Sequence, residues 1–296
     1  MSGRFAPSPT SNLHLGNLRT ALVAALMARA SDVGFLVRIE DLDVTRVAAA
    51  GDIATRQVED LAALGLRWDG PVVRQSARLE LYRAAIDSLP TYECFCTRRE
   101  IAEAASAPHA DGYRPYPGTC RNLSASERAA RRHVRPPALR VDAQGACVTV
   151  HDQWAGAVSG LVDDFVVRRN DGVYAYNLAV VVDDLAQGVT QVVRGEDLLT
   201  SSPRQAWLAR RLGGREPLYG HVGLVVNASG HRLAKRDGAV TLEDLAARGI
   251  SPSDVLSLLG ASLGLNHPGE PVTLLELNRR FDPAVKPPTW VWSRDA

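Results

Sequence analysis

Two short segments near the N-terminus combine residue types that could bind a nucleotide. The first is RFAPSPT at residues 4–10, and the second is HLGN at residues 14–17, which leads into a long helix-forming run. Free amide groups at the N-terminus of that helix would suit a phosphate, and Gly16 would let a flat ring pack against bare backbone. Taken alone, HLGN is better explained as a turn with a surface histidine, so its interpretation depends on the rest of the chain.

A cluster of charged residues follows the next apolar run. The segment VGFLVRIE at residues 33–40 is predicted to be a parallel strand, and its carboxyl end carries Arg38, Glu40, Asp41 and Asp43. Ligands of open α/β sheets bind beyond the carboxyl ends of strands, so these acidic groups are well placed to meet an amino group. A solvated acidic turn explains the same residues equally well when they are considered alone.

The elements that must position these residues are a strand, a tight turn and a buried helix. Residues 4–6 are predicted to end a short strand, because Pro7 and Pro9 fix φ and remove hydrogen-bond donors. Residues 17–30 carry good helix formers and no breaker, which predicts a helix. A strand, a turn and a helix at the start of the chain indicate the first βα unit of a nucleotide-binding sheet.

Three motifs, in this order along the chain, resemble one known family, the class I glutamyl-tRNA synthetases. They are RFAPSPTSNLHLGNLRTAL, RIEDLD at residues 38–43 and RLAKR at residues 232–236. HLGN stands where that family has its HIGH motif, and RLAKR where it has KMSKS. The resemblance runs from residue 4 to about residue 240 and implies a Rossmann-type α/β catalytic domain of the class I aminoacyl-tRNA synthetases. It further implies Mg²⁺ at the phosphates, catalytic roles for His14, Asn17 and Lys235, and ATP binding by His14, Gly16, Asn17 and Lys235.

The same resemblance implies a pocket for L-glutamate. Glu40 would bind the α-amino group of the substrate, and Tyr176 and Arg194 would complete the pocket. The two carboxylates of glutamate call for fixed guanidinium partners. Without the resemblance, Arg194 would be interpreted as a surface arginine after a strand. The implied glutamate-binding residues are Arg4, Phe5, Ala6, Pro7, Ser8, Glu40, Tyr176 and Arg194.

Lys235 is informative because the chain otherwise uses arginine almost throughout. Lys235 and Lys286 are the only lysines among 34 basic residues. A compact ammonium suits a phosphate as a point charge, where a planar guanidinium would need a different geometry. Arg232 and Ala234 replace the first lysine and the first serine of KMSKS, which leaves the central lysine in place.

Three cysteines form a candidate zinc site in a region rich in turns. Cys94 and Cys96 precede the capping box Thr97-x-x-Glu100, and the helix start that this box predicts favours the thiolate form. Cys120 ends the loop DGYRPYPGTC. Buried inert cysteines explain these residues about as well. The resemblance implies one Zn²⁺ per chain, held by Cys94, Cys96, Tyr116 and Cys120, with His109 as the rival fourth ligand.

The remaining elements are predicted from apolar periodicity and turn signals. Arginines crowd the segment 124–135, which could track a phosphate backbone or simply face solvent. Cys147 lies in an alternating strand and is expected to be structural. Helices are predicted at residues 52–64, 76–89, 124–135, 201–212 and within 241–265, and strands at 164–169, 174–179, 189–194 and 218–226, the first two joined as a hairpin by Asn170-Asp171-Gly172.

Composition and charge exclude several classes of protein. With 296 residues, of which 46% are hydrophobic and 23% charged, the chain has the composition of an ordinary globular protein. The net charge is only +1, so contact with nucleic acid must come from a local patch. No apolar run reaches membrane-spanning length, and MSGRFAP is not a signal peptide. We therefore expect a cytoplasmic protein without membrane contact, and no obligate protein partner is evident from the sequence.

The predicted domains lead to a prediction of the acceptor. Residues 1–240 are expected to form the catalytic domain, with the zinc-bearing insertion at about 91–165, and residues 241–296 a small helical region that contacts the tRNA stem. The residues after 240 are too few for an anticodon-binding domain, and GEDLLTSSPRQ at 195–205 is similar to the short paralogues of the family. The resemblance implies that these paralogues activate L-glutamate with ATP, without tRNA, and esterify the cyclopentenediol of queuosine at the wobble position of tRNA(Asp), whose anticodon stem-loop enters the active site. The alternatives are a truncated synthetase that charges tRNA(Glu) and an inactive paralogue that binds tRNA or glutamate.

Overall fold

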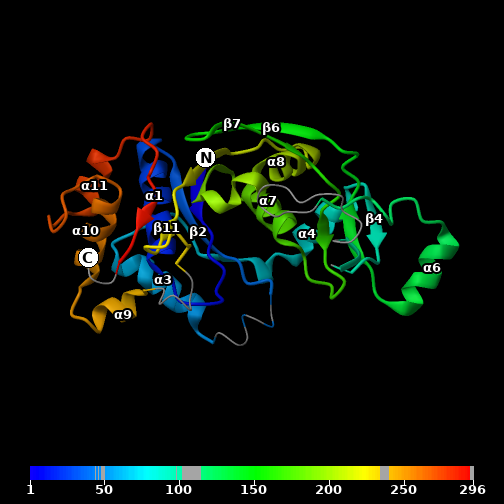
Figure 1. The fold of residues 1–296 in the computed structure, drawn as a ribbon, viewed down its shortest axis with the longest axis horizontal. Helices are drawn as coiled ribbons and strands as arrows, with labels where there is room; N and C mark the ends of the chain where they lie inside the picture. Colours follow the sequence, from blue (N-terminus) through cyan, green and yellow to red (C-terminus); the bar gives the residue numbers. More distant parts are fainter. Residues whose placement is uncertain are drawn as a thin grey trace.

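The computed structural model describes residues 1–43, 45, 47, 51–97, 99–101, 115–233 and 240–293. Its central sheet has seven strands: β1 (Ser2–Phe5), β2 (Gly34–Ile39), β3 (Val73–Arg74), β6 (Cys147–Asp152), β7 (Gly156–Leu161), β9 (Val189–Gly195) and β10 (Leu218–Val222). Their order in the sheet is β3-β2-β1-β9-β10-β6-β7. Figure 1 labels β2, β6 and β7 of this sheet. Neighbours pair in parallel except β6 and β7, which form an antiparallel hairpin.

The central sheet lies between two hydrophobic cores. Val193 belongs to the core of α1 (Leu15–Ala30), whereas its neighbour Val192 belongs to the core of α7 (Tyr176–Ala186) and α8 (Ser202–Arg211). Adjacent residues of a strand point to opposite faces, so the helices cover both faces of the sheet. This is the doubly wound α/β arrangement that the first βα unit predicts.

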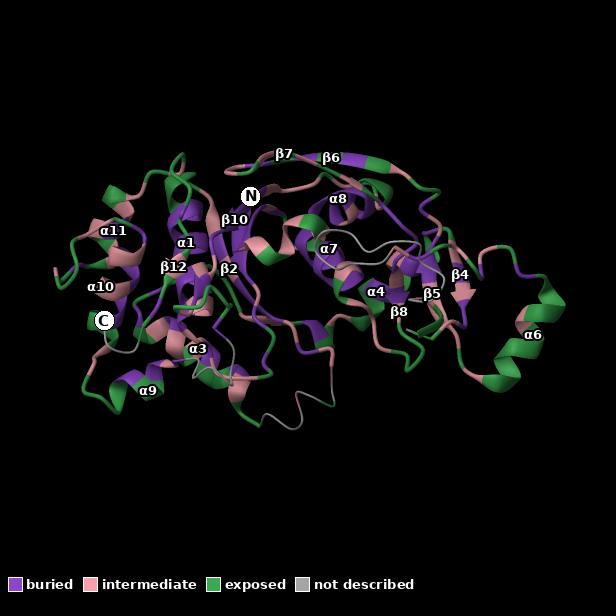
Figure 2. Ribbon diagram, in the orientation of Figure 1, coloured by how far each residue is buried: buried purple, intermediate pink, exposed green. Residues whose placement is uncertain are grey.

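Residues 91–165 contribute to two different sheets. β4 (Thr91–Cys94), β5 (Ala138–Val141) and β8 (Val166–Arg168) form a separate antiparallel sheet. The hairpin of β6 and β7 instead extends the edge of the central sheet beside β10. Between β4 and β5, α6 (Ala125–Val134) stands at the end of the molecule and has no buried residue (Figure 2). The start of the segment 91–165 therefore carries Cys94 and Cys96, and its later part, the hairpin of β6 and β7, joins the central sheet.

The C-terminal residues pack against α1. The helices α9 (Leu242–Ala246), α10 (Pro252–Ser262) and α11 (Leu274–Arg280) share one core with it (Figure 1). The chain then returns toward the sheet, and β12 (Trp290–Val291) pairs in parallel with β11 (Val225–Val226). Arg19 of α1 is 1% exposed and donates hydrogen bonds to the carbonyl oxygens of Gly223 (2.8 Å) and Pro288 (2.7 Å). One hydrophobic core thus includes residues on both sides of position 240.

Most predicted elements are found close to their predicted bounds. The predicted helix at 52–64 is α3 (Ile53–Ala63), and that at 76–89 is α4 (Leu79–Asp87) after a 3₁₀ turn at Gln75–Ala77. A second 3₁₀ turn, Glu196–Ser201, links β9 to α8. Within the described part of the chain, no helix is both long and apolar enough to cross a membrane.

The predicted strand at residues 174–179 is wrong. Only Tyr174 forms a bridge, with Arg168, and the chain enters α7 at Tyr176. Periodicity cannot distinguish strand from helix in an apolar run as short as LAVVV, and no side chain caps the start of α7. The helix forms because it is surrounded: it contacts β9, α4 and α8, which bury the apolar run from several sides.

Two further features were not predicted. α11 begins at a capping box in which the backbone N–H of Thr273 donates to the Glu276 carboxylate (2.7 Å), a signal that is present in the sequence TLLE. The predicted strand at 218–226 is divided at Gly223, where a Cβ atom would lie 2.5 Å from the carbonyl carbon of Pro288. Only glycine allows the returning C-terminal segment to approach the strand this closely.

Candidate active site

One cavity, of about 470 Å³, opens at the carboxyl ends of four adjacent parallel strands. Phe5 ends β1, Gly195 ends β9, Glu40 follows β2 and Gly223 follows β10. This edge of a parallel sheet is where ligands of α/β proteins bind, and the volume suits a small molecule. The cavity brings together most of the predicted substrate-binding residues: Phe5, Ala6, Pro7, Ser8, His14, Gly16, Asn17, Glu40, Tyr176 and Arg194.

His14 and Asn17 cap the N-terminus of α1 with their own side chains. The N–H of Gly16 donates to His14 Nδ1 (3.1 Å), and the N–H of His14 donates to Asn17 Oδ1 (3.3 Å). The N–H of Leu15 donates to Val240 O (3.0 Å), and the N–H of Asn17 to His14 O (2.8 Å). The expectation of free amides for a phosphate is therefore wrong, because the first-turn donors already have partners. The motif offers instead the positive end of the helix and the side-chain nitrogens His14 Nε2 and Asn17 Nδ2.

His14 is a neutral hydrogen-bond donor at neutral pH. Burial, helped by the positive charge of Arg232, lowers the pKa of His14 to about 4. Because Nδ1 accepts the Gly16 N–H, the proton of the neutral ring lies on Nε2. A Cβ atom on Gly16 would lie 3.1 Å from His14 Cε1, so a larger residue would displace the ring. The ring can therefore donate to a ligand in the cavity at any pH well above 4.

Glu40 is held by a buried cluster of charges behind the cavity. Arg38 lies 3.5 Å from Glu40 Oε1, 2.7 Å from Asp184 Oδ1 and 3.6 Å from Asp183 Oδ2. Arg4 donates to both carboxylate oxygens of Asp184 at 3.3 Å, and it is not among the residues that line the cavity. Burial raises the pKa of Glu40 above its usual value, although the charges of Arg38 and Arg4 oppose the shift.

The acidic members of this cluster were not predicted from the sequence. Asp183 and Asp184 directly follow the apolar run of α7, where buried acids need partners. Arg38 inside an apolar strand is a second signal, since a buried guanidinium calls for carboxylates. Arg78 adds a contact of 2.6 Å to Asp183, so the described cluster holds three guanidiniums and, with Glu40, three carboxylates.

Arg194 is oriented by hydrogen bonds, none of which goes to a carboxylate of the described residues. A guanidinium has five N–H hydrogens, and four of those of Arg194 have protein partners, which leaves one on Nη1. Arg194 therefore lines the cavity as an ordered cation with a donor available for a ligand. Its partners are His221 Nε2 (3.0 Å from Nε), Gln205 Oε1 (2.7 Å from Nη1), and Leu198 O and Ser202 Oγ (3.1 and 2.8 Å from Nη2).

The proline loop and Tyr176 form other parts of the lining. Gln57, which is buried, donates to the carbonyl oxygens of Ser8 (3.0 Å) and Ser11 (2.8 Å) and so holds the loop in place. Tyr176 is the first residue of α7, and its side chain is 42% exposed at the cavity. Gln57 was not singled out from the sequence, where nothing distinguishes it from a solvent-facing helical residue.

The RLAKR motif begins at the same cavity. Arg232 lines it and pairs with Asp197, which lines it too. Lys235 lies outside the described residues, together with the rest of 234–239. Val240, the next described residue, accepts the hydrogen bond from the first N–H of α1. The described residues on both sides of Lys235 are therefore close to HLGN or to the cavity.

Three cysteines and one tyrosine meet beside β4. The sulfur atoms of Cys94, Cys96 and Cys120 all lie within 4.8 Å of one another, and those of Cys96 and Cys120 are 3.5 Å apart. The Tyr116 hydroxyl is 3.4 Å from Cys94 Sγ and 3.6 Å from Cys96 Sγ. In a tetrahedral site with Zn–S bonds of about 2.3 Å, two sulfurs lie about 3.8 Å apart. The four donors therefore fit one Zn²⁺ ion, whereas His109 lies outside the described residues.

Without a metal ion, burial keeps part of this donor set protonated. Burial raises the pKa of Cys96 to about 12, and burial likewise raises the pKa of Tyr116. A bound metal ion reverses this tendency, because it stabilises thiolate ligands. Cys147 is exposed at the start of β6 and takes no part in the cluster.

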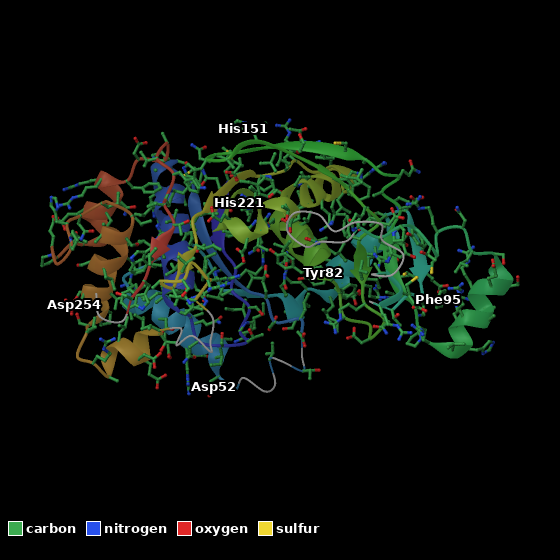
Figure 3. All side chains as sticks on the ribbon, in the orientation of Figure 1. Asp52, Tyr82, Phe95, His151, His221 and Asp254 are labelled. Atoms are coloured by element: carbon green, nitrogen blue, oxygen red, sulfur yellow. The ribbon has the colours of Figure 1, made fainter. Side chains whose placement is uncertain are left out.

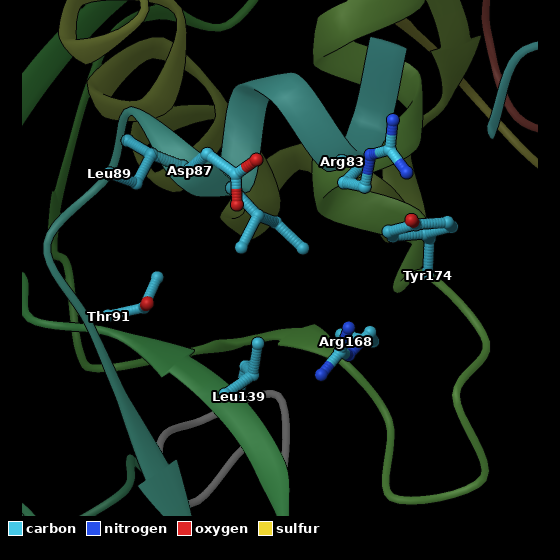
Figure 4. A pocket seen from close by; sticks show the side chains of 8 residues that line it. Arg83, Asp87, Leu89, Thr91, Leu139, Arg168 and Tyr174 are labelled. Carbon is cyan, nitrogen blue, oxygen red and sulfur yellow. The ribbon is translucent and has the colours of Figure 1, made fainter. Parts of the chain in front are cut away.

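A second cavity, of about 370 Å³, lies beside α4 and the small sheet (Figure 4). Arg83 and Asp87 reach it from α4, and Arg168 and Tyr174 from the segment that precedes α7. It shares no lining residue with the first cavity, and none of the predicted site residues lines it.

Comparisons with known proteins agree with this geometry. The family described as tRNA synthetases class I (E and Q), catalytic domain, matches residues 1–281. Proteins named glutamyl-Q tRNA(Asp) synthetase from Nocardia farcinica and Cutibacterium acnes are 58% and 55% identical to this chain; both matches cover 97% of it, and 91% and 82% of the respective relatives.

Two solved structures are similar over the whole chain. The glutamate-tRNA synthetase of Elizabethkingia anophelis has a TM-score of 0.82 at 26% identity, covering 100% of this chain and 68% of that one. A glutamate tRNA ligase from Elizabethkingia meningosepticum, solved in complex with its amino acid, has a TM-score of 0.81 at 25% identity, covering 100% and 67%. The predicted class I α/β fold is confirmed, and the relatives show that this is an enzyme of the aminoacyl-tRNA synthetase type. The chain belongs to the glutamyl-Q tRNA(Asp) synthetases, within the family of class I tRNA synthetase catalytic domains for glutamate and glutamine.

Proposed function

We propose that this enzyme activates L-glutamate with ATP, without tRNA, and transfers the glutamyl group to the cyclopentenediol of queuosine at the wobble position of tRNA(Asp). ATP, glutamate and a tRNA are the partners expected of its family. The observation that carries the proposal is one cavity, lined by Glu40, by residues of the HLGN motif and by Arg194, which has no carboxylate partner among the described residues.

The part of the cavity around Glu40 and Arg194 suits a substrate that carries one positively charged group and two negatively charged groups. The Glu40 carboxylate would bind the α-amino group, and Arg194 would bind a carboxylate with its remaining Nη1 donor. Tyr176 and the loop of residues 5–8 would enclose the carbon chain. Arg4 does not line the cavity, so it would contribute only through its charge near Glu40, while its own partner is Asp184.

The nucleotide side would carry out the adenylation step. An oxygen of the glutamate α-carboxylate attacks the α-phosphorus of ATP, an O–P bond forms, the bond to the β-phosphate oxygen breaks, and pyrophosphate leaves. His14 Nε2–H, Asn17 and the positive end of α1 would stabilise the charge on the phosphates, and Lys235 would do the same as a point charge. Mg²⁺ would enter with ATP, since it is bound largely through substrate phosphates and water. No residue of the chain needs to act as a nucleophile.

The acceptor is proposed from the names of the relatives and from the chemistry of a cis-diol. A hydroxyl of the cyclopentenediol would attack the glutamyl carbonyl carbon, its proton would be released, and AMP would leave. The diol resembles that of a terminal ribose, so one site could serve either kind of acceptor. The anticodon stem-loop would enter the active site, and the region 241–296, which contains α9, α10 and α11, would contact the tRNA stem.

Transfer assays with labelled glutamate test this proposal. We expect glutamate-dependent exchange of pyrophosphate into ATP without tRNA, and label on tRNA(Asp) that contains queuosine but not on tRNA(Asp) that lacks it. The label should remain on queuosine-containing tRNA(Asp) from which the terminal adenosine has been removed. Label on tRNA(Glu) would instead favour the truncated synthetase, and the absence of pyrophosphate exchange would favour the inactive paralogue.

We further propose that Cys94, Cys96, Tyr116 and Cys120 hold one structural Zn²⁺ ion, which would tie β4 to the loop that ends at Cys120. We expect about one zinc per chain by metal analysis of protein kept away from chelators, and its loss in the variants Cys94→Ser and Cys120→Ser. Cys147→Ser is the matched control and should keep the metal, because Cys147 is exposed and outside the cluster. Equal zinc content in the wild type and in all three variants would rule out Cys94 and Cys120 as ligands.

The raised pKa of Glu40 predicts a pH dependence of glutamate recognition. Only the carboxylate form attracts the α-amino group, and burial makes Glu40 accept a proton at a higher pH than an ordinary glutamate. As the pH falls through this pKa, kcat/KM for glutamate should therefore fall, by about tenfold for each further pH unit. Glu40→Gln should remove this acid limb, while His14, with a pKa of about 4, should not contribute to it. A profile of the same shape in both proteins would contradict the role of Glu40.

A further inference from the structure

Three neighbouring strands each contribute one buried polar residue to a row of side chains, and only Arg194, at one end of the row, lines the cavity. Arg194 of β9 and His221 of β10 are paired across the two strands. Asp152 ends β6 and is paired with Tyr219, two residues before His221. Tyr219 belongs to the hydrophobic core of α7 and α8. Because residues two apart in a strand point to the same face of the sheet, His221 also lies on the face that α7 and α8 cover.

The three side chains form one chain of hydrogen bonds. Asp152 Oδ2 is 2.6 Å from His221 Nδ1, and His221 Nε2 accepts from Arg194 Nε at 3.0 Å. Asp152 and His221 are both almost fully buried. An arginine Nε can only donate, so His221 must accept on Nε2 and carry its proton on Nδ1, pointing at the carboxylate.

The charges agree with this assignment. Burial lowers the pKa of His221, although its hydrogen bond to Asp152 opposes the shift. Burial raises the pKa of Asp152, but the hydrogen bonds from His221 and from two backbone N–H groups outweigh it and hold the pKa below its usual value. The resting state is therefore an ionised Asp152, a neutral His221 and a cationic Arg194.

We propose that Asp152 and His221 are positioning residues for substrate recognition: Asp152 fixes the ring and tautomer of His221, and His221 orients the guanidinium of Arg194 toward a substrate carboxylate. The inference rests on the proposed role of Arg194 in binding L-glutamate. It assigns a recognition role to the end of the β6–β7 hairpin, a segment that reaches the site only through β10. Buried networks of this kind hold a binding group in one geometry before the ligand arrives.

Asp152→Asn is the sharpest test, because it leaves the surrounding turn intact. Asp152 Oδ1 accepts from the N–H groups of Trp154 (3.0 Å) and Ala155 (2.8 Å), and an asparagine oxygen can keep both contacts. The asparagine NH₂ group then faces His221 Nδ1, which must accept. The ring proton moves to Nε2, where it meets the N–H of Arg194, so two donors oppose each other.

Two substitutions of His221 separate its two contacts. His221→Asn keeps a donor for Asp152 but has no acceptor for Arg194, whereas His221→Gln can present an oxygen near the place of Nε2. The matched control is His151→Gln, because His151 lies on the same strand as Asp152 but is exposed; Figure 3 labels both histidines.

Glutamate-dependent pyrophosphate exchange provides the first measurement. We expect Asp152→Asn and His221→Asn to raise KM for glutamate by about tenfold or more, as for the loss of a hydrogen bond to a charged group, with KM for ATP unchanged. His221→Gln should restore most of the glutamate affinity, and His151→Gln should behave like the wild type. An unchanged KM for glutamate in His221→Asn, or an equal defect in folded His221→Asn and His221→Gln, would overturn the proposal.

The second measurement is the tautomer of His221, determined from the ¹⁵N chemical shifts of its ring. We expect the Nδ1–H form in the wild type and the Nε2–H form in Asp152→Asn, with the His221 signals assigned from the His221→Gln spectrum. An Nε2–H or doubly protonated ring in the wild type would overturn the proposal, and this measurement needs no folded Asp152 variant. If the wild type showed no glutamate-dependent exchange, the proposed function would fail, while the tautomer would still decide whether the hydrogen-bond chain exists.

Discussion

Replacing Arg194 by alanine is expected to lower kcat/KM for glutamate by about 30- to 1,000-fold, equivalent to about 2–4 kcal/mol. The substitution removes the only arginine that lines the cavity without a carboxylate partner among the described residues. It also leaves Gln205 Oε1 and His221 Nε2 buried without their donor, which adds to the loss. Pyrophosphate exchange at varied glutamate and at varied ATP measures the effect, which should fall on the glutamate parameters.

Two further variants make this result specific. Arg194→Lys should recover little activity, because one ammonium cannot reproduce four fixed contacts and a fifth donor. Arg211→Ala is a suitable control, since Arg211 is an exposed residue of α8 whose guanidinium lies over Trp207, away from the cavity lining. Activation of glutamine as efficient as that of glutamate, or near-normal turnover in Arg194→Ala, would refute the proposed pocket.

Replacing Arg38 by methionine is expected to lower the free energy of unfolding by about 3–5 kcal/mol. Arg38 is fully buried and contacts Glu40, Asp183 and Asp184, so its loss leaves three carboxylates with two guanidiniums. Methionine fills much of the vacated space, so the measured loss reports the uncompensated charge more than a cavity. The whole stability of a typical domain is about 5–15 kcal/mol, which makes this a severe change.

Urea unfolding measures the effect as a lower midpoint with an unchanged slope. The control is Arg83→Met: Arg83 pairs with Glu80 on the surface, with the two side chains 64% and 77% exposed, and such a pair is worth about 1 kcal/mol or less. Equal midpoints for the two variants would show that the buried cluster is not what stabilises Glu40 and its surroundings. The Arg38 variant should also bind glutamate more weakly as the pH falls, because loss of the Arg38 charge raises the pKa of Glu40 further and favours its protonated form.

The main elements could be predicted because their signals are local. The helix after HLGN contains strong helix formers and no breaker, and β2 is an apolar run interrupted only by Arg38. The first turn of α7, residues 176–179, was predicted as the end of a strand because this apolar run is too short to show a period, and its surroundings, not its sequence, decide its conformation. α11 was missed although its capping box is visible in the sequence.

The candidate site could be predicted only in part. Ten of the residues that line the cavity were expected, from HLGN, RFAPSPT, Glu40, Tyr176 and Arg194, whereas other lining residues were not: Thr20, Asp197, Leu198, Gly223, Leu224 and Val225. The partners of the expected residues were not predicted either, since Asp183, Asp184 and His221 carry no motif and look like ordinary residues of a helix and a strand. The occupied amides at the start of α1 were also unexpected, because one of their acceptors is Val240, more than two hundred residues away in the chain.

The sequence by itself determined the family and the kind of chemistry, and it predicted which residues would meet a substrate, because reactive side chains and turn formers act through their own type and their near neighbours. Only the tertiary structure decided which of these groups are free to act. Arg4 and Arg194 are both buried arginines of parallel strands, yet Arg4 forms an ion pair with Asp184, 180 positions away, whereas Arg194 is held by His221 and other uncharged groups and has no carboxylate partner among the described residues. Such pairings depend on which distant strands and helices become neighbours, and that is settled by the packing of the whole chain around the sheet.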